Sequence, residues 1–290
     1  MSNSLLSLSN QLADAVEKAG ASVIAVNARR ATPSSGVIWR PGVIATSDHT
    51  TERDEEITVT FGDGRSAPAT LAGRDATTDL AVLRLADTSG TVADVAGDAE
   101  LRAGNIVLAV GRGPTASLGV VSSVGGAFRS WRGGAIDKYL RLDVSIYHGF
   151  SGGALIDAEG RVLGINTSGI ARGMPMTVPA VTVNRVVEEL LKRGHIGRGY
   201  LGVGLQPVRL PSGQGGLIVL SVETDGPAEK AGLLVGDILT GVDGKPMADP
   251  VDLQAQLDPS QVGRTVLAQI IRGGAKAEIP IKVGERPRGA

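Results

Sequence analysis

Residues 149 to 157 read Gly149-Phe150-Ser151-Gly152-Gly153-Ala154-Leu155-Ile156-Asp157. The segment places a serine on a glycine-flanked turn directly before an apolar, strand-like run. Glycines beside a serine let the backbone turn sharply and let amide hydrogens approach a substrate carbonyl, as the stabilisation of an oxyanion requires. An ordinary hairpin is the competing interpretation, because small-residue turns that contain serine are common between strands. The turn therefore indicates a nucleophile only if a base and an acid accompany it.

A serine nucleophile needs a histidine base, and the chain contains three histidines, His49, His148 and His195. His49 closes the apolar run 42–49 and is expected at a strand end, where a side chain can face a cleft. His148 lies only three residues before Ser151, so we expect it to line the substrate path or to be solvated. His195 follows a predicted helix and is expected at the surface. His49 is the predicted base.

The carboxylate that orients the base is predicted at Asp79, which begins the strand-like run 79–85. Asp75 and Asp48 compete on chemistry alone. Asp48 adjoins His49, however, and neighbouring side chains on an extended chain point to opposite faces. The resulting order of His, Asp and Ser is that of chymotrypsin-like enzymes and differs from those of subtilisin and the α/β-hydrolases.

Several separate strings match one family. They are Leu12-Ala13-Asp14-Ala15-Val16-Glu17-Lys18, Thr46-Ser47-Asp48-His49, Glu56-Ile57-Thr58-Val59-Thr60-Phe61 with 62–65, Thr78-Asp79-Leu80-Ala81-Val82-Leu83, the segment 143–155 and Gly164-Ile165-Asn166-Thr167. In these strings the chain resembles the HtrA-type serine proteases, a chymotrypsin-like domain followed by a PDZ domain. The resemblance implies a mostly β fold, a chymotrypsin-like double β-barrel followed by a small α+β PDZ domain.

The resemblance also implies a role for each site residue. His49 is the implied general base, Asp79 its orienting acid and Ser151 the nucleophile. The backbone N–H groups of Gly149 and Ser151 are the implied oxyanion hole, and the chemistry requires no metal or cofactor.

The second part of the chain resembles a PDZ domain through 226–233 and 236–244. Tyr200, Leu201, Gly202 and Val203 stand where that domain has its carboxylate-binding loop, and a peptide could add as a strand beside 201–205. Asp249 is predicted to start a short helix through Leu257, which either walls a groove or packs in the core. The predicted boundaries are 1–195 for the protease domain with its N-terminal helix and 196–290 for the PDZ domain.

Two residues of the serine turn depart from the family pattern. Phe150 stands in place of the usual Asn, and Ala154 in place of the usual Pro. With Phe150 the loop is either less well fixed or packed into an apolar site, which leaves open whether the oxyanion hole is pre-formed. The preceding Ser145, Ile146 and Tyr147 include no acid, so we expect cleavage after apolar, small-to-medium residues.

Periodicity predicts a first barrel over 22–85 and a second from strands at 105–110, 119–124, 139–143, 154–156 and 162–165. A helix is predicted over 184–193, with Asn184 as its cap and Gly194 at its end.

Composition fits this organisation. A length of 290 residues with 42% hydrophobic content is enough for one large and one small globular unit. With 29 Lys and Arg against 30 Asp and Glu, the formal net charge of −1 gives no reason to expect nucleic acid or an anionic membrane as partner. No run approaches about 18 apolar residues. Zero cysteines and the lack of a signal-like N-terminus favour a cytoplasmic location, or a periplasmic one if the N-terminus has been trimmed.

These features predict a serine endopeptidase of protein quality control that cleaves unfolded or exposed polypeptides and binds peptide C-termini at its PDZ domain. One alternative is a latent protease that acts as a PDZ-mediated peptide-binding or chaperone-like protein. An esterase with the same chemistry is less favoured, because a PDZ domain implies a polypeptide partner. A homo-oligomer stays open: family trimers often use aromatic residues near the N-terminus, and residues 1–38 contain none.

Overall fold

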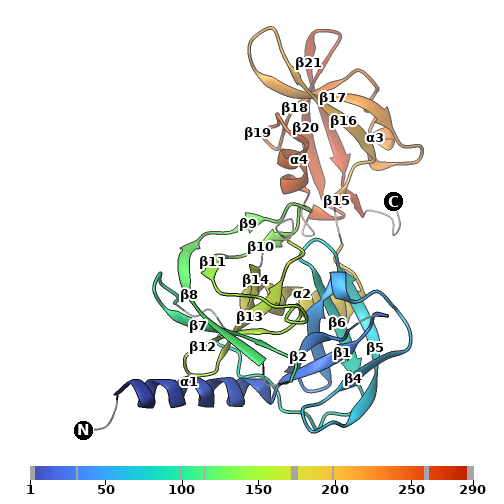
Figure 1. The fold of residues 1–290 in the computed structure, drawn as a ribbon. Helices are drawn as coiled ribbons and strands as arrows, with labels where there is room; N and C mark the ends of the chain where they lie inside the picture. The colour runs from blue at the N-terminus through green and yellow to red at the C-terminus, as the bar shows by residue number, and fades with distance from the viewer. Residues whose placement is uncertain are drawn as a thin grey trace. The chain divides into compact units, whose positions relative to one another are not determined.

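The structure is a computed structural model that describes residues 4–30, 32–97, 100–113, 115–170, 176–197, 199–257 and 261–285. The chain divides into two compact units, 1–196 and 197–290. The sequence predicted a division one residue earlier, between 195 and 196. Each unit is described by itself. The mostly β character predicted from the sequence is confirmed, with strands throughout both units (Figure 1).

The first barrel occupies the N-terminal half of the first unit. Its strands are β1 (Val23–Asn27), β2 (Ser34–Arg40), β3 (Val43–Ser47), β4 (Ile57–Thr60), β5 (Ser66–Asp75) and β6 (Leu80–Leu85). They pair antiparallel in the order β1-β2-β3-β6-β5-β4, and β4 returns to β1 to close the barrel. Inward-facing aliphatic side chains such as Ile24, Ile44 and Leu83 fill its interior. A short 3-10 helix, η1 (Asp48–Thr50), follows β3.

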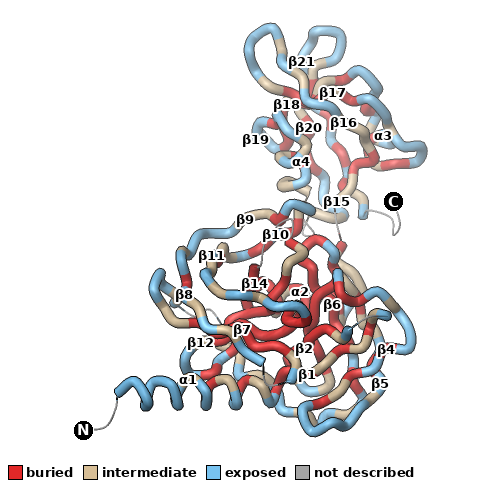
Figure 2. Tube along the Cα trace, in the orientation of Figure 1, coloured by how far each residue is buried: buried red, intermediate tan, exposed pale blue. Residues whose placement is uncertain are grey.

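The second set of strands forms a six-stranded sheet in the order β11-β8-β7-β12-β13-β14. Its strands are β7 (Ile106–Gly111), β8 (Thr115–Gly125), β11 (Tyr139–Asp143), β12 (Ala154–Asp157), β13 (Val162–Thr167) and β14 (Met176–Pro179). The end strands β11 and β14 approach each other, so the sheet curls into a nearly closed barrel. A small hairpin, β9 (Phe128–Arg129) with β10 (Ala135–Ile136), lies between β8 and β11 in the chain. Buried residues concentrate on the strands of both barrels (Figure 2).

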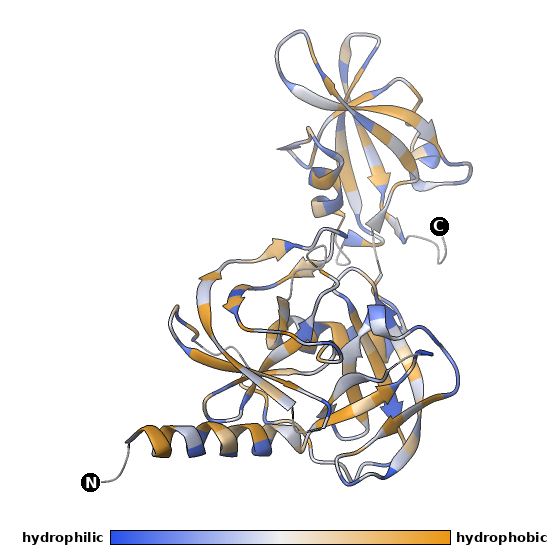
Figure 3. Ribbon diagram, viewed as in Figure 1, coloured by the Kyte–Doolittle hydropathy of each residue, from blue (hydrophilic) through white to orange (hydrophobic). Residues whose placement is uncertain are grey.

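Two helices accompany the barrels. Helix α1 (Ser4–Gly20) alternates apolar and polar residues along its length (Figure 3) and buries Ala15 and Ala19. Helix α2 (Ala180–Arg193) ends at Gly194 in the left-handed conformation, as predicted. Its predicted start was wrong. The helix begins four residues earlier, after Pro179, and the side chain of Asn184 accepts a hydrogen bond from the indole N–H of Trp39 at 2.8 Å instead of capping the helix.

The second unit is a small α+β domain. Its main sheet has the order β16-β17-β18-β20-β21, with β19 paired to β18, and β15 pairs separately with β22. The strands are β15 (Gly199–Tyr200), β16 (Val203–Arg209), β17 (Gly215–Val222), β18 (Ile238–Val242), β19 (Lys245–Pro246), β20 (Thr265–Arg272), β21 (Ala275–Lys282) and β22 (Gly284–Glu285). The helices are α3 (Pro227–Lys230) and α4 (Pro250–Gln256).

The ends of α4 follow the sequence closely. Asp249 caps the helix through a hydrogen bond from the Val251 N–H, and Asp252 completes a reciprocal capping box. The predicted short helix after Asp249 is therefore confirmed. No helix within the described ranges is long and apolar enough to span a membrane.

Candidate active site

Of the three residues predicted for catalysis, His49 and Ser151 line one cleft of the first unit, and Asp79 is buried beside His49. His49 lies in η1 directly after β3, Asp79 directly before β6, and Ser151 on the turn before β12. Strands β3 and β6 are neighbours in the first barrel, with Ser47 paired to Leu80. This pairing places His49 beside Asp79, although 30 residues separate them in the chain.

Asp79 is completely buried and its carboxylate is fully engaged. The Nδ1 atom of His49 lies 2.6 Å from Oδ2, and the backbone N–H of His49 donates to Oδ1 at 2.8 Å. The hydroxyl of Thr167 also donates to Oδ2. These contacts orient the imidazole through Nδ1 and leave Nε2 on the opposite side of the ring from Asp79.

The two competing carboxylates lie elsewhere. Asp75 accepts hydrogen bonds from the hydroxyls of Thr77 and Thr78, both at 2.7 Å. Asp48 is buried and lies 3.4 Å from Nε of Arg74. Burial raises the pKa of the Asp48 carboxyl, while the Arg74 guanidinium opposes the change. Neither acid contacts the imidazole, so Asp79 is the residue placed to orient it.

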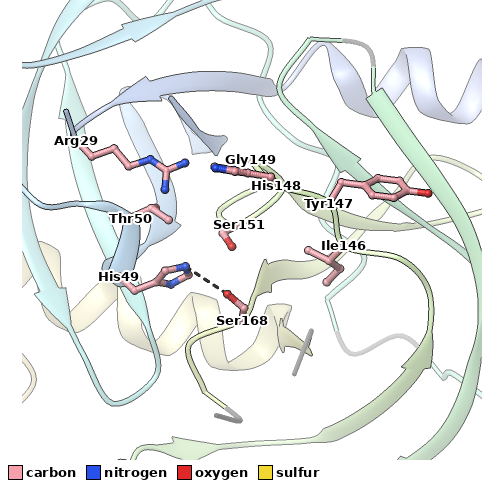
Figure 4. A pocket seen from close by; sticks show the side chains of 9 residues that line it. All are labelled: Arg29, His49, Thr50, Ile146, Tyr147, His148, Gly149, Ser151 and Ser168. Atoms are coloured by element: carbon pink, nitrogen blue, oxygen red, sulfur yellow. Dashed lines mark hydrogen bonds between the residues drawn. The ribbon is translucent and has the colours of Figure 1, made fainter. Parts of the chain in front are cut away.

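Ser151 and His49 line the same cleft, which has a volume of about 260 Å³ (Figure 4). No hydrogen bond joins these two described side chains. The hydroxyl within reach of His49 Nε2 belongs to Ser168, at 3.5 Å. Catalytic hydrogen bonds are often long in the absence of substrate and tighten once it binds. His148 is exposed and lines the cleft, whereas His195 is outside it.

The serine turn is held by a residue that the sequence did not indicate, Ser35 on β2. Gly149 has φ 92°, a left-handed conformation that favours glycine. The Ser35 hydroxyl donates to the Gly149 carbonyl at 2.6 Å, and the Ser35 N–H donates to the Ser151 carbonyl at 3.1 Å. The same hydroxyl accepts the N–H of Arg112 at 2.8 Å. A strand of the first barrel thus fixes the turn before β12 on both sides of Phe150.

Phe150 packs into an apolar site. It is only 4% exposed, and its ring meets that of Tyr147 edge to face at 5.4 Å between centroids. The ring also covers Gly111, where an added Cβ atom would lie 2.5 Å from the ring. Burial of the ring therefore replaces the polar contacts of the usual Asn.

The proposed oxyanion donors have no internal partner. Within the described part of the chain, neither the Gly149 N–H nor the Ser151 N–H donates a hydrogen bond. The carbonyl of Gly149 is occupied by Ser35. The arrangement leaves two amides available to a ligand beside Ser151.

Four side chains of this site escaped the sequence reasoning: Ser35, Thr167, Ser168 and Arg29. Thr167 is the last residue of the string 164–167 and Ser168 follows it, so their place at the end of that string was the available signal. Ser35 and Arg29 carried none, because Ser35 meets the serine turn across the fold and Arg29 reaches the cleft from a loop without a distinctive motif. Among the described residues no group of three or more His, Cys, Asp or Glu side chains is placed to hold a metal ion.

The four residues predicted for the PDZ groove lie between β15 and the start of β16. Gly202 has φ 75°, and Leu201 is buried. Within the described ranges the N–H groups of Leu201 and Gly202 have no internal acceptor. Tyr200 pairs with Gly284 in the small sheet, and its hydroxyl donates to Glu223. Val203 begins β16, which lies at an edge of the main sheet.

Two family models match separate parts of the chain. A Trypsin-like peptidase domain matches residues 34–165, and a PDZ domain matches residues 199–283. The serine endoprotease DegS of Escherichia coli is 30% identical over 277 residues, which cover 88% of this chain and 78% of DegS. The chain belongs to the HtrA-type serine proteases.

Other relatives give the same family. A probable periplasmic serine endoprotease, DegP-like, of Rhizobium meliloti is 34% identical over 278 residues, covering 90% of this chain and 55% of that protein. The chain thus spans about half the length of the DegP-like relatives it matches. The HtrA-type protease AlgW with decapeptide superposes with a TM-score of 0.76 at 27% identity, covering 95% of this chain and 99% of AlgW. The serine endoprotease from Yersinia pestis gives 0.77 at 32%, with 96% and 98% covered.

The predicted cytoplasmic location of this HtrA-type protease is wrong. The DegP-like relatives are named periplasmic serine endoproteases, which points to the periplasm. The physical reason is that a fold without disulfides is stable in either redox environment, so the absence of cysteine does not distinguish the compartments.

Proposed function

We propose that this chain is a serine endopeptidase that cleaves unfolded or exposed polypeptides in the periplasm. The observation that supports it best is the 2.6 Å contact between His49 Nδ1 and the buried Asp79 carboxylate, with Ser151 in the same cleft. The proposed catalytic domain is 1–195 and the proposed PDZ domain 196–290. The homo-oligomer considered from the sequence stays a prediction.

The proposed reaction uses only side chains and backbone of the chain. Ser151 Oγ attacks the scissile carbonyl while His49 Nε2 takes its proton, and Asp79 stabilises the imidazolium that forms. The N–H groups of Gly149 and Ser151 stabilise the oxyanion. His49 then gives its proton to the leaving amine, and water repeats the sequence on the acyl-enzyme.

We also propose a preference for apolar, small-to-medium residues before the scissile bond. Ile146 and Tyr147 line the cleft, and no Asp or Glu is among its described lining residues. A peptide library checks this. Faster cleavage after Lys or Arg would contradict it.

The PDZ domain is proposed to receive a peptide C-terminus as an added strand beside β16. The support is the exposed edge of β16, the left-handed Gly202 and the available N–H groups of Leu201 and Gly202. A labelled peptide with a free C-terminus should bind by fluorescence polarisation. Its amidated form, or Gly202→Val, should weaken binding at least tenfold, since each removes the carboxylate contact or the φ that allows it.

The protease proposal is tested by a fluorophosphonate probe. The probe should label the full chain, and Ser151→Ala should abolish the labelling, while a chain with Gly202→Val should still be labelled. The probe is also tested with an added unfolded substrate protein and a PDZ-binding peptide. Absence of labelling even under these conditions would instead favour a latent protease that acts as a peptide-binding or chaperone-like protein.

A further inference from the structure

The cleft contains a cation that the proposed reaction does not use. Arg29 lines it together with His49, Thr50 and Ser151, while no carboxylate is among the described lining residues. Arg29 comes from the loop between β1 and β2, far in sequence from the serine turn. A half-buried arginine beside the reacting groups is placed to contact substrate.

The stem of Arg29 is anchored, and its terminal nitrogens are available. Its Nε donates to the carbonyl of Thr32 at 2.6 Å, and its own carbonyl accepts a hydrogen bond from Arg53 at 3.1 Å. Within the described part of the chain, its two terminal nitrogens donate to no other group, and no carboxylate pairs with it. An arginine fixed at Nε still offers donors to an oxygen pair, so little rotamer entropy is lost when a carboxylate binds.

The position of Arg29 indicates which part of a substrate it meets. The guanidinium end points toward the space between His49 and His148, and Ile146 lies across Ser151 from it (Figure 4). His49 must protonate the leaving amine, so the residues that follow the scissile bond have to pass over His49 and Thr50. Arg29 lies on that side of Ser151.

We propose that Arg29 binds a carboxylate on the leaving segment, within the first two residues after the scissile bond, and thereby selects substrates. This inference rests on the proposed protease function. The carboxylate is either an Asp or Glu side chain or the C-terminus of a substrate that ends there. One charge-assisted hydrogen bond in a partly exposed site gives about a tenfold preference in kcat/KM.

The test uses the full chain and matched quenched-fluorescence peptides with one apolar residue before the scissile bond. One series carries Asp, Asn or Lys at the first or second position after it. A second series ends at the second position with a free or an amidated C-terminus, which separates a side-chain carboxylate from a chain end. The variants are Arg29→Gln and Arg29→Glu. Arg30→Gln is the control. Arg30 is exposed, belongs to the same loop and does not line the cleft, and its replacement by Gln removes the same charge as Arg29→Gln.

We expect wild type and Arg30→Gln to favour the carboxylate about tenfold in at least one series. Arg29→Gln should bring that ratio to about one while cleaving the neutral peptide within about twofold of wild type, and Arg29→Glu should favour Lys. Fluorophosphonate labelling of Ser151, measured in every variant, should be unchanged because Arg29 contacts neither His49 nor Asp79 by any described hydrogen bond.

Two results would overturn the proposed role of Arg29 while leaving the protease function intact. In the first, Ser151 is labelled and the peptides are cleaved without any preference for the carboxylate. In the second, Arg29→Gln retains the preference. If Ser151 is not labelled and no peptide is cleaved, the protease function itself fails, and the role of Arg29 fails with it.

Discussion

Replacement of Ser35 by Ala should slow the chemistry of Ser151 far more than it destabilises the fold. The Ser35 hydroxyl is completely buried, donates to the Gly149 carbonyl at 2.6 Å and accepts the Arg112 N–H at 2.8 Å. Its removal leaves two polar groups without their partner, at about 1 kcal/mol each, so the free energy of unfolding should fall by about 2 kcal/mol. A domain of ordinary stability remains folded after such a loss.

The chemical effect comes from the position of the turn. Without the Ser35 hydroxyl, the peptide between Gly149 and Phe150 keeps only the hydrogen bond from the Phe150 N–H to the Tyr147 carbonyl. A rotation of this peptide changes the backbone angles of Gly149 and so shifts the neighbouring peptide, which carries the Gly149 N–H, away from the oxyanion. A displacement of about 1 Å in such a site costs about 100-fold in rate. The second-order rate of fluorophosphonate labelling measures this directly, since it depends on Ser151 and the oxyanion donors but requires no peptide substrate.

Thr46→Val is the matched control. The Thr46 hydroxyl is also completely buried and donates to the carbonyl of Ser35 at 2.6 Å; it packs beside Gly152 but makes no described hydrogen bond to the serine turn. Urea unfolding should show a comparable loss of stability in both variants, about 1–2 kcal/mol for Thr46→Val. Labelling should fall about 100-fold in Ser35→Ala and by no more than about threefold in Thr46→Val. Equal losses of labelling in the two variants, or wild-type labelling in Ser35→Ala, would refute the reasoning.

Three further outcomes follow from buried contacts. Thr167→Val removes a donor to Asp79 and the acceptor of the Gly169 N–H, so it should slow labelling about tenfold and lower the free energy of unfolding in urea by about 2 kcal/mol; an unchanged rate would contradict it. Phe150→Ala empties a buried site, so urea unfolding should show a loss of about 3 kcal/mol, and a loss below about 1 kcal/mol would mean that the ring is not packed as described. Hydrogen bonds from Arg272 to the Asp237 carboxylate, at 2.6 and 2.7 Å, lower the pKa of that carboxyl below its ordinary value of 3.8. Their stabilisation of the fold is therefore present above the ordinary pKa, and it is lost as the pH falls through the lower pKa of the folded state. Arg272→Met should therefore lower the free energy of unfolding more near about pH 7 than near about pH 2, and an equal loss at both would exclude this linkage.

The sequence predicted those parts of the structure that depend on neighbouring residues. Asp249 caps α4 because its side chain reaches an N–H two residues along, and Gly194 ends α2 because only the local φ matters there. Asn184 fitted the same rule and failed. Its partner Trp39 lies 145 residues away, and a tertiary hydrogen bond took the side chain that local preference assigned to a cap.

The candidate site shows the same limit. His49, Asp79 and Ser151 could be chosen because few residues have the required chemistry and their order is distinctive. Ser35 and Arg29 belong to no recognisable sequence motif. Ser35 matters because it contacts Gly149, more than 100 positions further along the chain. Arg29 matters because the fold places it in the cleft of His49 and Ser151. Phe150 was recognised as unusual, but only the facing Gly111 shows where its ring goes.

The contacts of Ser35 and Ser47 connect the reacting groups through the junction of the two barrels. Ser35 on β2 holds the turn of Ser151, and Ser47, which immediately precedes η1, donates to the carbonyl of Asn166 on β13. The N–H of Gly152 donates to that same carbonyl at 2.8 Å. The base and the nucleophile are therefore positioned by one set of hydrogen bonds between barrels. A substitution that shifts β2 against β12 must change the distance from His49 to Ser151 even where it leaves each barrel intact, so activity should be lost before either barrel unfolds.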